Sequence, residues 1–215
     1  MEFISKELDD YVCQHTDKEP ELLYNLNRKT NIEVLRPRMI SGHFQGRTLS
    51  MFSKMIQPER ILEIGTYTGY SALCLAEGLK ENGKLITIDI NEELEDIIQE
   101  HIDQSEFKHK IELRIGDAMK IIPEIDETFD IVFVDADKQN YANYYDLVFD
   151  KVKIGGYIMS DNVLWSGKVI EEVLPNDKDT PIILDFNAKI QQDERVENIL
   201  LPIRDGILIA RKIKD

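Results

Sequence analysis

Several features that narrow the function of a protein are scarce or missing in these 215 residues. No apolar run is long enough to cross a bilayer, which argues against a membrane-spanning helix. The two cysteines, Cys13 and Cys74, have no paired spacing, so we expect neither a disulfide framework nor a cysteine-based metal site. Residues 1–7 lack the basic head and apolar centre of a signal peptide, and we therefore expect a cytoplasmic protein.

Positive charge is also scarce, because 26 Lys and Arg residues stand against 41 Asp and Glu residues, for a net charge of −15. This balance disfavours non-specific binding to nucleic acid or to anionic membranes. The segment 28–47 runs against the trend with five Lys or Arg residues, His43 and only Glu33 as an acid. It is either a solvated basic face, which we favour, or a patch that guides an anionic substrate.

The chain length predicts a single domain over residues 1–215. Residues 1–57 form a helical N-terminal part that covers the active site, with apolar spacing that predicts helices over 20–34 and 45–55. From Arg60 onward, short apolar runs alternate with amphipathic segments. Strands are expected over 61–64, 84–89, 111–115, 129–134 and 156–160, and helices over 69–81, 91–104, 118–122 and 141–152, with Asn91 as an N-cap. The longest irregular piece, 175–181, is expected to be a surface loop.

This alternation predicts an α/β protein of the Rossmann-like kind, with a mostly parallel sheet and helices on both faces. The C-terminal end differs, because the strand-like segments 198–203 and 207–211 are joined by only three residues. So short a connection requires an antiparallel hairpin, and the last strand is therefore antiparallel.

Acidic side chains follow two of the expected strands. Asp135 and Asp137 come after the fourth strand, and Asp161 and Asn162 close the fifth. Alternation along the chain sends Asp135 and Asp137 to opposite sides, and Asp135 is the better candidate because it lies right at the strand end. Asp135, Asp161 and Asn162 offer three oxygen ligands, which suits a divalent cation such as Mg²⁺ and leaves about three positions of its octahedron open.

Two adjacent hydroxyls of a substrate can occupy those positions, and a metal-bound hydroxyl loses its proton near neutral pH. Lys138 can take or relay that proton; the alternative is a surface lysine paired with Asp137. Trp165, the only tryptophan, follows Asn162 by three residues and either stacks on a planar substrate or lies at a rim.

A second motif indicates a nucleotide-like cofactor. Gly65 and Gly69 lie in the first strand-to-helix turn with the spacing G-x-x-x-G, unlike the G-x-G-x-x-G of dinucleotide binders. Glu63 just before the turn repels a phosphate. Asp89 closes the second strand, where a carboxylate accepts ribose hydroxyls, and Asp117 closes the third, where it can accept from an adenine amino group. A phosphate-averse acidic site suits the sulfonium cofactor S-adenosylmethionine (SAM), although G-x-x-x-G by itself is often only a tight turn. One of Tyr67 and Tyr70 is expected to cover the cofactor and the other to pack in the core.

From about Arg36 to the C-terminus, the chain resembles the cation-dependent O-methyltransferases of the caffeoyl-CoA and catechol type. The resemblance rests on four segments: Glu-Ile-Gly-Thr-Tyr-Thr-Gly-Tyr-Ser (63–71), Val-Asp-Ala-Asp-Lys-Gln-Asn-Tyr (134–141), Asp-Asn-Val-Leu-Trp-Ser-Gly (161–167) and Leu-Pro-Ile-Arg-Asp-Gly-Ile (201–207). It implies a seven-stranded SAM-methyltransferase fold, a homodimer, metal ligation by Asp135, Asp161 and Asn162, and a catalytic role for Lys138. The SAM contacts that it implies are Glu63, Gly65, Tyr67, Ser71, Asp89, Asp117, Ala118 and Asp135, with the segment Met39 to Ser41 closing over the methionine end.

These features predict cation-dependent methyl transfer from SAM to a hydroxyl of a catechol-like, hydroxycinnamoyl or flavonoid phenol, with Mg²⁺, Mn²⁺ or Ca²⁺ as the cation. The alternative within the same fold is a tRNA 5-hydroxyuridine O-methyltransferase, which the segment 28–47 favours and the overall acidity disfavours. A third hypothesis is a SAM-binding regulator without catalysis. The presence of Lys138 beside a complete set of metal ligands argues against it. A nicotinamide-dependent oxidoreductase is discouraged by the glycine spacing and Glu63.

Overall fold

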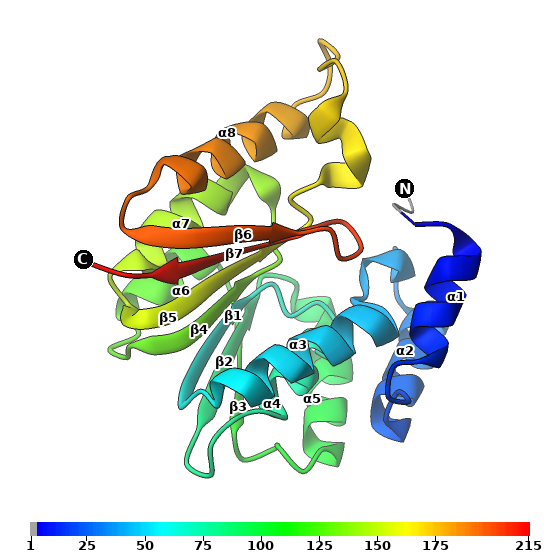
Figure 1. The fold of residues 1–215 in the computed structure, drawn as a ribbon. Coiled ribbons are helices and arrows are strands. Elements are labelled where there is room, and N and C mark those ends of the chain that lie inside the picture. The colour runs from blue at the N-terminus through cyan, green and yellow to red at the C-terminus, as the bar shows by residue number, and fades with distance from the viewer. Residues whose placement is uncertain (1–3) are drawn as a thin grey trace. The chain divides into compact units, whose positions relative to one another are not determined.

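The protein is described from a computed structural model that covers residues 4–215 (Figure 1). Residues 1–3, which the single-domain prediction and the argument on the signal peptide include, lie outside the described residues. Seven strands form one sheet in the order β3-β2-β1-β4-β5-β7-β6, with helices around it. Among the strand pairs with a described register, the two that involve β7, with β5 and with β6, are antiparallel and the others are parallel, which confirms the predicted fold class.

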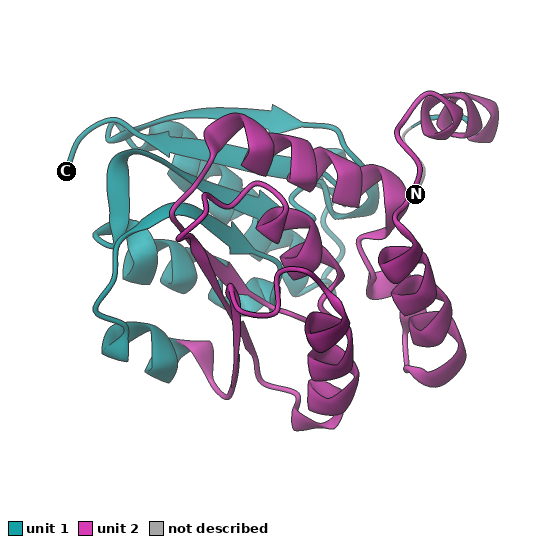
Figure 2. Cartoon of the chain, turned by 90° about the horizontal axis from the view of Figure 1, so that it is seen from below, with its two compact units in different colours: residues 1–5, 119–215 teal, residues 6–118 magenta. Residues whose placement is uncertain are grey.

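The chain divides into two compact units (Figure 2). One comprises Lys6–Ala118, and the other comprises Met119–Asp215 together with residues 4–5. That residues 1–215 act as a single domain stays a prediction.

The unit Lys6–Ala118 begins with helices and continues with alternating strands and helices. Its elements are α1 (Lys6–Gln14), α2 (Glu21–Glu33), the 3-10 helix η1 (Pro37–Met39), α3 (Gly42–Ile56), β1 (Arg60–Ile64), α4 (Tyr70–Ala76), β2 (Lys84–Asp89), η2 (Glu92–Leu94), α5 (Glu95–Gln104) and β3 (Ile111–Ile115). Successive residues of β1 and β2 are buried, as expected for parallel strands covered on both sides.

Two local predictions in this unit can be compared with the structure. Asn91 caps η2 by accepting a hydrogen bond from the Glu93 N–H at 3.1 Å, so the predicted N-cap is confirmed. The helix expected over 69–81 ends at Ala76. Gly78, two residues beyond that end, packs directly on α3: an added Cβ would be 2.1 Å from the backbone carbon of Ser53.

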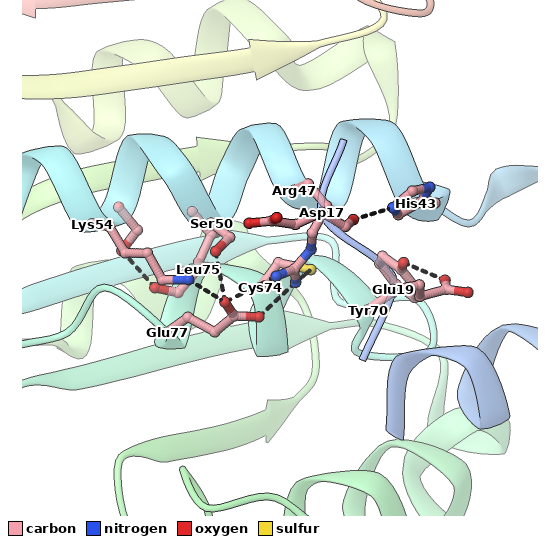
Figure 3. A network of polar contacts seen from close by, with 11 residues as sticks. Asp17, Glu19, His43, Arg47, Ser50, Lys54, Tyr70, Cys74, Leu75 and Glu77 are labelled. Atoms are coloured by element: carbon pink, nitrogen blue, oxygen red, sulfur yellow. Dashed lines mark hydrogen bonds and ion pairs between the residues drawn. The ribbon is translucent and has the colours of Figure 1, made fainter. Parts of the chain in front are cut away.

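A half-buried carboxylate, that of Glu77, joins α3 to the segment that follows α4 (Figure 3). Glu77 accepts hydrogen bonds from Arg47 at 2.5 Å, from Ser50 at 2.7 Å and from Lys54 at 2.7 Å. Burial raises the pKa of Glu77, but these three donors outweigh it and hold the pKa below its ordinary value of 4.5. The neighbouring Cys74 is a buried free thiol whose pKa burial raises to about 12.

We expect Glu77→Gln to lower the free energy of unfolding by about 2 kcal/mol at pH 7, because charge-assisted hydrogen bonds are lost. Glu77 contributes its full stabilisation above the pKa of the unfolded chain, and the contribution disappears as the pH falls through the lower folded-state pKa. The gap between wild type and variant should therefore close in acid, as measured by urea unfolding between pH 7 and pH 3. Glu59→Gln, which breaks an exposed pair with Lys80, is the control and should change little. A gap that stays constant with pH contradicts the prediction.

The unit Met119–Asp215 holds the C-terminal part of the sheet and its helices. Its elements are α6 (Ala118–Glu124, which starts one residue before the unit), β4 (Phe129–Val134), η3 (Lys138–Asn140), α7 (Tyr141–Phe149), β5 (Val152–Asp161), η4 (Trp165–Ile170), α8 (Asp179–Gln192), β6 (Val196–Leu201) and β7 (Ile207–Lys212). The antiparallel pairing of β6 with β7 confirms the hairpin that the short connection requires.

The loop before α8 differs from its prediction. It was expected over 175–181, but α8 already begins at Asp179, so Pro181 lies in the first helical turn, where its missing N–H costs nothing. Asp177 caps this helix by accepting from the Thr180 N–H at 3.0 Å and from the Thr180 hydroxyl at 2.7 Å. Across the described part of the chain, no helix has the length and apolar character needed to span a membrane.

Candidate active site

The first strand-to-helix turn, between β1 and α4, needs unusual backbone angles. Gly65 and Gly69 have φ of +98° and +92°, and Tyr67 between them has φ of +51°. The Gly65 N–H donates to the Ile88 carbonyl at 2.9 Å, which ties the turn to the end of β2. The spacing G-x-x-x-G therefore supplies two of the three positive-φ positions of a tight turn, and Tyr67 takes the third.

Asp89, at the end of β2, is hydrogen-bonded to the backbone of this turn. One carboxylate oxygen accepts from the Tyr67 N–H at 2.7 Å, and the other accepts from the Asn91 N–H at 2.9 Å. Each carboxylate oxygen has a second lone-pair site, so Asp89 can still accept hydrogen bonds from a ligand diol. The geometry fits the predicted ribose contact, which stays a prediction.

The two tyrosines of the turn have different surroundings. Tyr70 is buried, and its hydroxyl donates to Glu19 at 2.5 Å, so Tyr70 is the one that packs in the core. The half-buried Tyr67 reaches the Arg36 carbonyl with its hydroxyl at 3.2 Å, and burial raises its pKa.

The other residues with predicted SAM contacts in this unit lie on several elements. Glu63 is fully buried in β1 and accepts from the Thr87 hydroxyl at 2.5 Å. The remaining five are Ser71 in the first turn of α4 and Ser41 before α3, both buried; Met39 in η1, exposed; Asp117 after β3, half-buried; and Ala118 at the start of α6, buried. Their contacts with SAM stay predictions, as does that of Asp135 in the other unit.

The ends of β4 and β5 bring the two acidic motifs together in the unit Met119–Asp215. The strands are parallel, and Val134 is in register with Ser160. Asp135 and Asp161 are the next residues along each strand. The expectation that the motifs lie side by side is confirmed for the strand ends.

Lys138 is a buried residue, 9% exposed, and lies between these strand ends. Its Nζ donates to Asn162 Oδ1 at 2.9 Å and lies 3.5 Å from Asp135 Oδ1. The exposed Asp137 instead accepts from the Tyr144 hydroxyl at 2.7 Å. The alternative of a surface lysine paired with Asp137 is therefore wrong, and Asp135 is the acid beside Lys138.

The possible metal ligands are all oxygen atoms, which fits a hard cation better than a transition metal that prefers nitrogen or sulfur. They comprise only two carboxylates, from Asp135 and from the buried Asp161, with the carboxamide of Asn162. Within residues 4–215, no group of three or more His, Cys, Asp or Glu residues could hold a metal ion. Metal binding by these residues stays a prediction.

The backbone after β5 is strained. Asn162, Trp165 and Ser166 have φ of +59°, +48° and +55°, a region that residues other than glycine seldom adopt. The Asn162 N–H donates to Asp161 Oδ1 at 2.7 Å. Such strain persists only where surrounding contacts hold it, and it concentrates at functional sites.

The β6–β7 hairpin supplies those contacts. Asp205 accepts from the Ser166 N–H with its carboxylate and from the Leu164 N–H with its carbonyl, the latter at 2.8 Å. Gly206 is closely packed, since a Cβ there would lie 2.5 Å from Leu164 Cγ. The hairpin thereby holds the backbone of the half-buried Trp165, whose contact with a substrate stays a prediction.

Sequence reasoning singled out neither Asp205 nor Tyr141, although both lie in the segments that carry the resemblance. Tyr141 is fully buried, accepts a hydrogen bond from Lys138 and donates to the Asp161 carbonyl at 2.9 Å. Burial first, and then the nearby Asp135, Asp161 and Asp137, raise its pKa well above the ordinary value. Its position three residues after Lys138, one helical turn away, was the available signal.

The strand order with its antiparallel β7, and the acidic residues at the ends of successive strands, define a Rossmann-like SAM-dependent methyltransferase. Residues 13–213 match the model of the O-methyltransferase family. The chain is 36% identical over 227 residues to caffeoyl-CoA O-methyltransferase 1 of Arabidopsis thaliana, a match that covers 97% of this chain and 85% of the relative. The chain belongs to the O-methyltransferase family and is a SAM-dependent O-methyltransferase.

Solved structures agree with this assignment. The SAH-bound methyltransferase PaMTH1 of Podospora anserina has a TM-score of 0.87 at 27% identity, covering 100% of this chain and 99% of that chain. The O-methyltransferase TomG of Streptomyces achromogenes, involved in tomaymycin synthesis and solved with SAM, has a TM-score of 0.86 at 27% identity, covering 96% of each chain. These neighbours support binding of SAM or its product SAH by this chain.

Proposed function

We propose that this enzyme transfers a methyl group from SAM to one hydroxyl of a catechol-like, hydroxycinnamoyl or flavonoid phenol, with Mg²⁺ or another divalent cation, such as Mn²⁺ or Ca²⁺, bound by Asp135, Asp161 and Asn162. The observation that carries the proposal is the buried amine of Lys138, held beside Asp135 and Asn162 at the ends of two strands. The similarity to caffeoyl-CoA O-methyltransferases supports a phenolic acceptor.

In this proposal the side chains of the enzyme bind the cation, orient the acceptor and move a proton. Asp135, Asp161 and Asn162 provide oxygen ligands on neighbouring strand ends. When bound, a cation there would hold two adjacent oxygens of the acceptor and stabilise negative charge on one of them. Lys138 Nζ takes the proton of the reacting hydroxyl, and Trp165 packs on the ring of the acceptor.

The proposal that SAM is the cofactor is supported by the turn between β1 and α4. Asp89 accepts from the ribose hydroxyls of SAM with its remaining lone pairs, and the left-handed turn at Gly65 lets the backbone approach the ligand. The buried Glu63 disfavours a phosphate, which distinguishes SAM from a dinucleotide.

The tRNA alternative is weakened by ion pairs within the segment 28–47. Arg47 is tied to Glu77, and Lys29 is paired with Glu100. Both pairs remove positive charge that a phosphate backbone would need. Arg28, Arg36 and Arg38 remain as the other basic residues of this segment.

A methyl-transfer screen with labelled SAM tests the proposal. We expect label in catechol, caffeate, caffeoyl-CoA or a flavonoid in the presence of Mg²⁺, and none after chelation. Bulk tRNA is included as a substrate to test the tRNA methyltransferase alternative. That alternative predicts label in tRNA and binding of tRNA that depends steeply on salt concentration. Label in no phenol with or without Mg²⁺ contradicts the proposal.

The homodimer and the cytoplasmic location remain predictions. Gel filtration with light scattering tests the homodimer.

A further inference from the structure

Tyr141 joins the two strand ends of the candidate site through its hydroxyl. It is the first residue of α7 and is fully buried, with its ring edge-on to Phe186 at a centroid distance of 5.3 Å. Its hydroxyl accepts from Lys138 Nζ and donates to the Asp161 carbonyl at 2.9 Å, with the Val134 carbonyl farther away at 3.4 Å.

The Tyr141 hydroxyl acts as a donor to the strand ends and as an acceptor from Lys138. A phenol has one proton to donate, and the two carbonyls at the ends of β4 and β5 compete for it. Its lone pairs face the amine of Lys138. The oxygen of Tyr141 is therefore the common partner of the lysine and of the backbone at Asp161.

We propose that Tyr141 is a positioning residue that fixes the amine of Lys138 between Asp135 and Asn162. The inference rests on the proposed function, in which Lys138 moves the proton. A lysine side chain has four rotatable bonds, and ordering it in one conformation costs free energy that fixed partners must supply. The Tyr141 hydroxyl is a rigid partner because its ring is packed in the core.

Tyr141→Phe removes one oxygen and retains the ring. The contact of the Lys138 amine with the ring face, 4.3 Å from the centroid, is kept, as is the packing on Phe186. Tyr145→Phe is a matched control: Tyr145 lies in the same helix, is equally buried, and its hydroxyl donates to Asp193 at 2.9 Å, outside the candidate site.

The first measurement is a kinetic double-mutant cycle. In the wild-type background, Tyr141→Phe should lower kcat roughly tenfold to a hundredfold, since misplacing a catalytic group has effects of that order. The KM for SAM should stay unchanged, and Tyr145→Phe should leave kcat unchanged. In a Lys138→Met background, Tyr141→Phe should cause no further loss, because a residue that acts through Lys138 has nothing left to position. An additive loss, or unchanged kcat in the single variant, overturns the proposal.

The second measurement does not need activity. In protein labelled with ¹³C-lysine, the two Hε protons of Lys138 should be inequivalent and shifted by the Tyr141 ring current, with Lys138→Met providing the assignment. They should merge toward one averaged signal in Tyr141→Phe and stay resolved in Tyr145→Phe. Degenerate, unshifted Hε protons in the wild type overturn the proposal without any variant, and a pattern that survives in Tyr141→Phe also overturns it.

The two measurements separate this proposal from the proposed function. If the wild type transfers no methyl group, the proposed function fails, and the NMR result alone decides whether Tyr141 orders Lys138. If methyl transfer occurs and the Lys138 signals are insensitive to Tyr141, the positioning role alone is wrong.

Discussion

Asp161→Asn should lower kcat/KM for methyl transfer by roughly a hundredfold or more and abolish its dependence on a divalent cation. Asp161 is buried at the end of β5, 2% exposed, and is one of only two carboxylates in the proposed ligand set. The amide of the variant can still accept from the Asn162 N–H, so the strained turn is kept while the charge is removed. The measurement is methyl transfer at saturating SAM with Mg²⁺ or with a chelator, together with Mn²⁺ binding followed by electron paramagnetic resonance.

Asp137→Asn is the matched control for the loss of a carboxylate near this strand end. Asp137 lies two residues from Asp135 but accepts from Tyr144 and from Asn140, which keeps it away from Lys138. The control should retain cation dependence and most of the activity. Full turnover of Asp161→Asn in the presence of a chelator contradicts a metal role for Asp161.

Lys138→Met should lower kcat roughly a hundredfold to ten-thousandfold, the range usually lost with a general acid or base. Methionine keeps most of the apolar stem and removes the amine that contacts Asp135 and Asn162. SAM binding, measured by calorimetry, should be unchanged, because Lys138 is assigned to the acceptor hydroxyl. The kinetic measurement is single-turnover methyl transfer with the acceptor that the screen identifies.

Lys212→Met distinguishes this effect from the general consequence of deleting a buried lysine. Lys212 is 2% exposed, and its amine lies 4.7 Å from the centroid of the Phe149 ring, much as Lys138 lies over Tyr141. It donates to the Phe149 carbonyl and has no place in the proposed chemistry. Equal losses of activity in the two variants would show that Lys138 is only structural.

Much of the fold could be predicted because its signals are local. Buried parallel strands are continuous apolar runs, as in β4, where five of six residues are buried. A three-residue connection cannot cross a sheet, so the direction of β7 follows from the length of residues 204–206. The predicted ends of helices were less accurate than the predicted strands and strand directions where contacts with distant segments lie at those ends. The helix expected over 69–81 ends at Ala76, and just beyond that end Gly78 packs on Ser53 of α3, a contact that no pattern within 69–81 encodes.

For the candidate site, the order of residues was enough to predict which chemical groups stand at which strand ends. Asp89, Asp135, Asp161 and Asn162 lie where an α/β sheet gathers its ligands, because strand periodicity and strand ends are readable from neighbouring residues. It left open whether Lys138 takes part in proton transfer or is a surface lysine paired with Asp137.

The hydrogen-bond partners of these groups depend on contacts between segments that are far apart in the chain. Lys138 contacts Asp135 and Asn162, and Tyr141 at the start of α7 accepts a hydrogen bond from the same amine. Trp165 takes a strained conformation because Asp205, 40 residues later in the chain, holds the adjacent backbone. Burial periodicity is a property of neighbouring residues, whereas a choice between two partners depends on strand register and side-chain packing among segments far apart in the sequence.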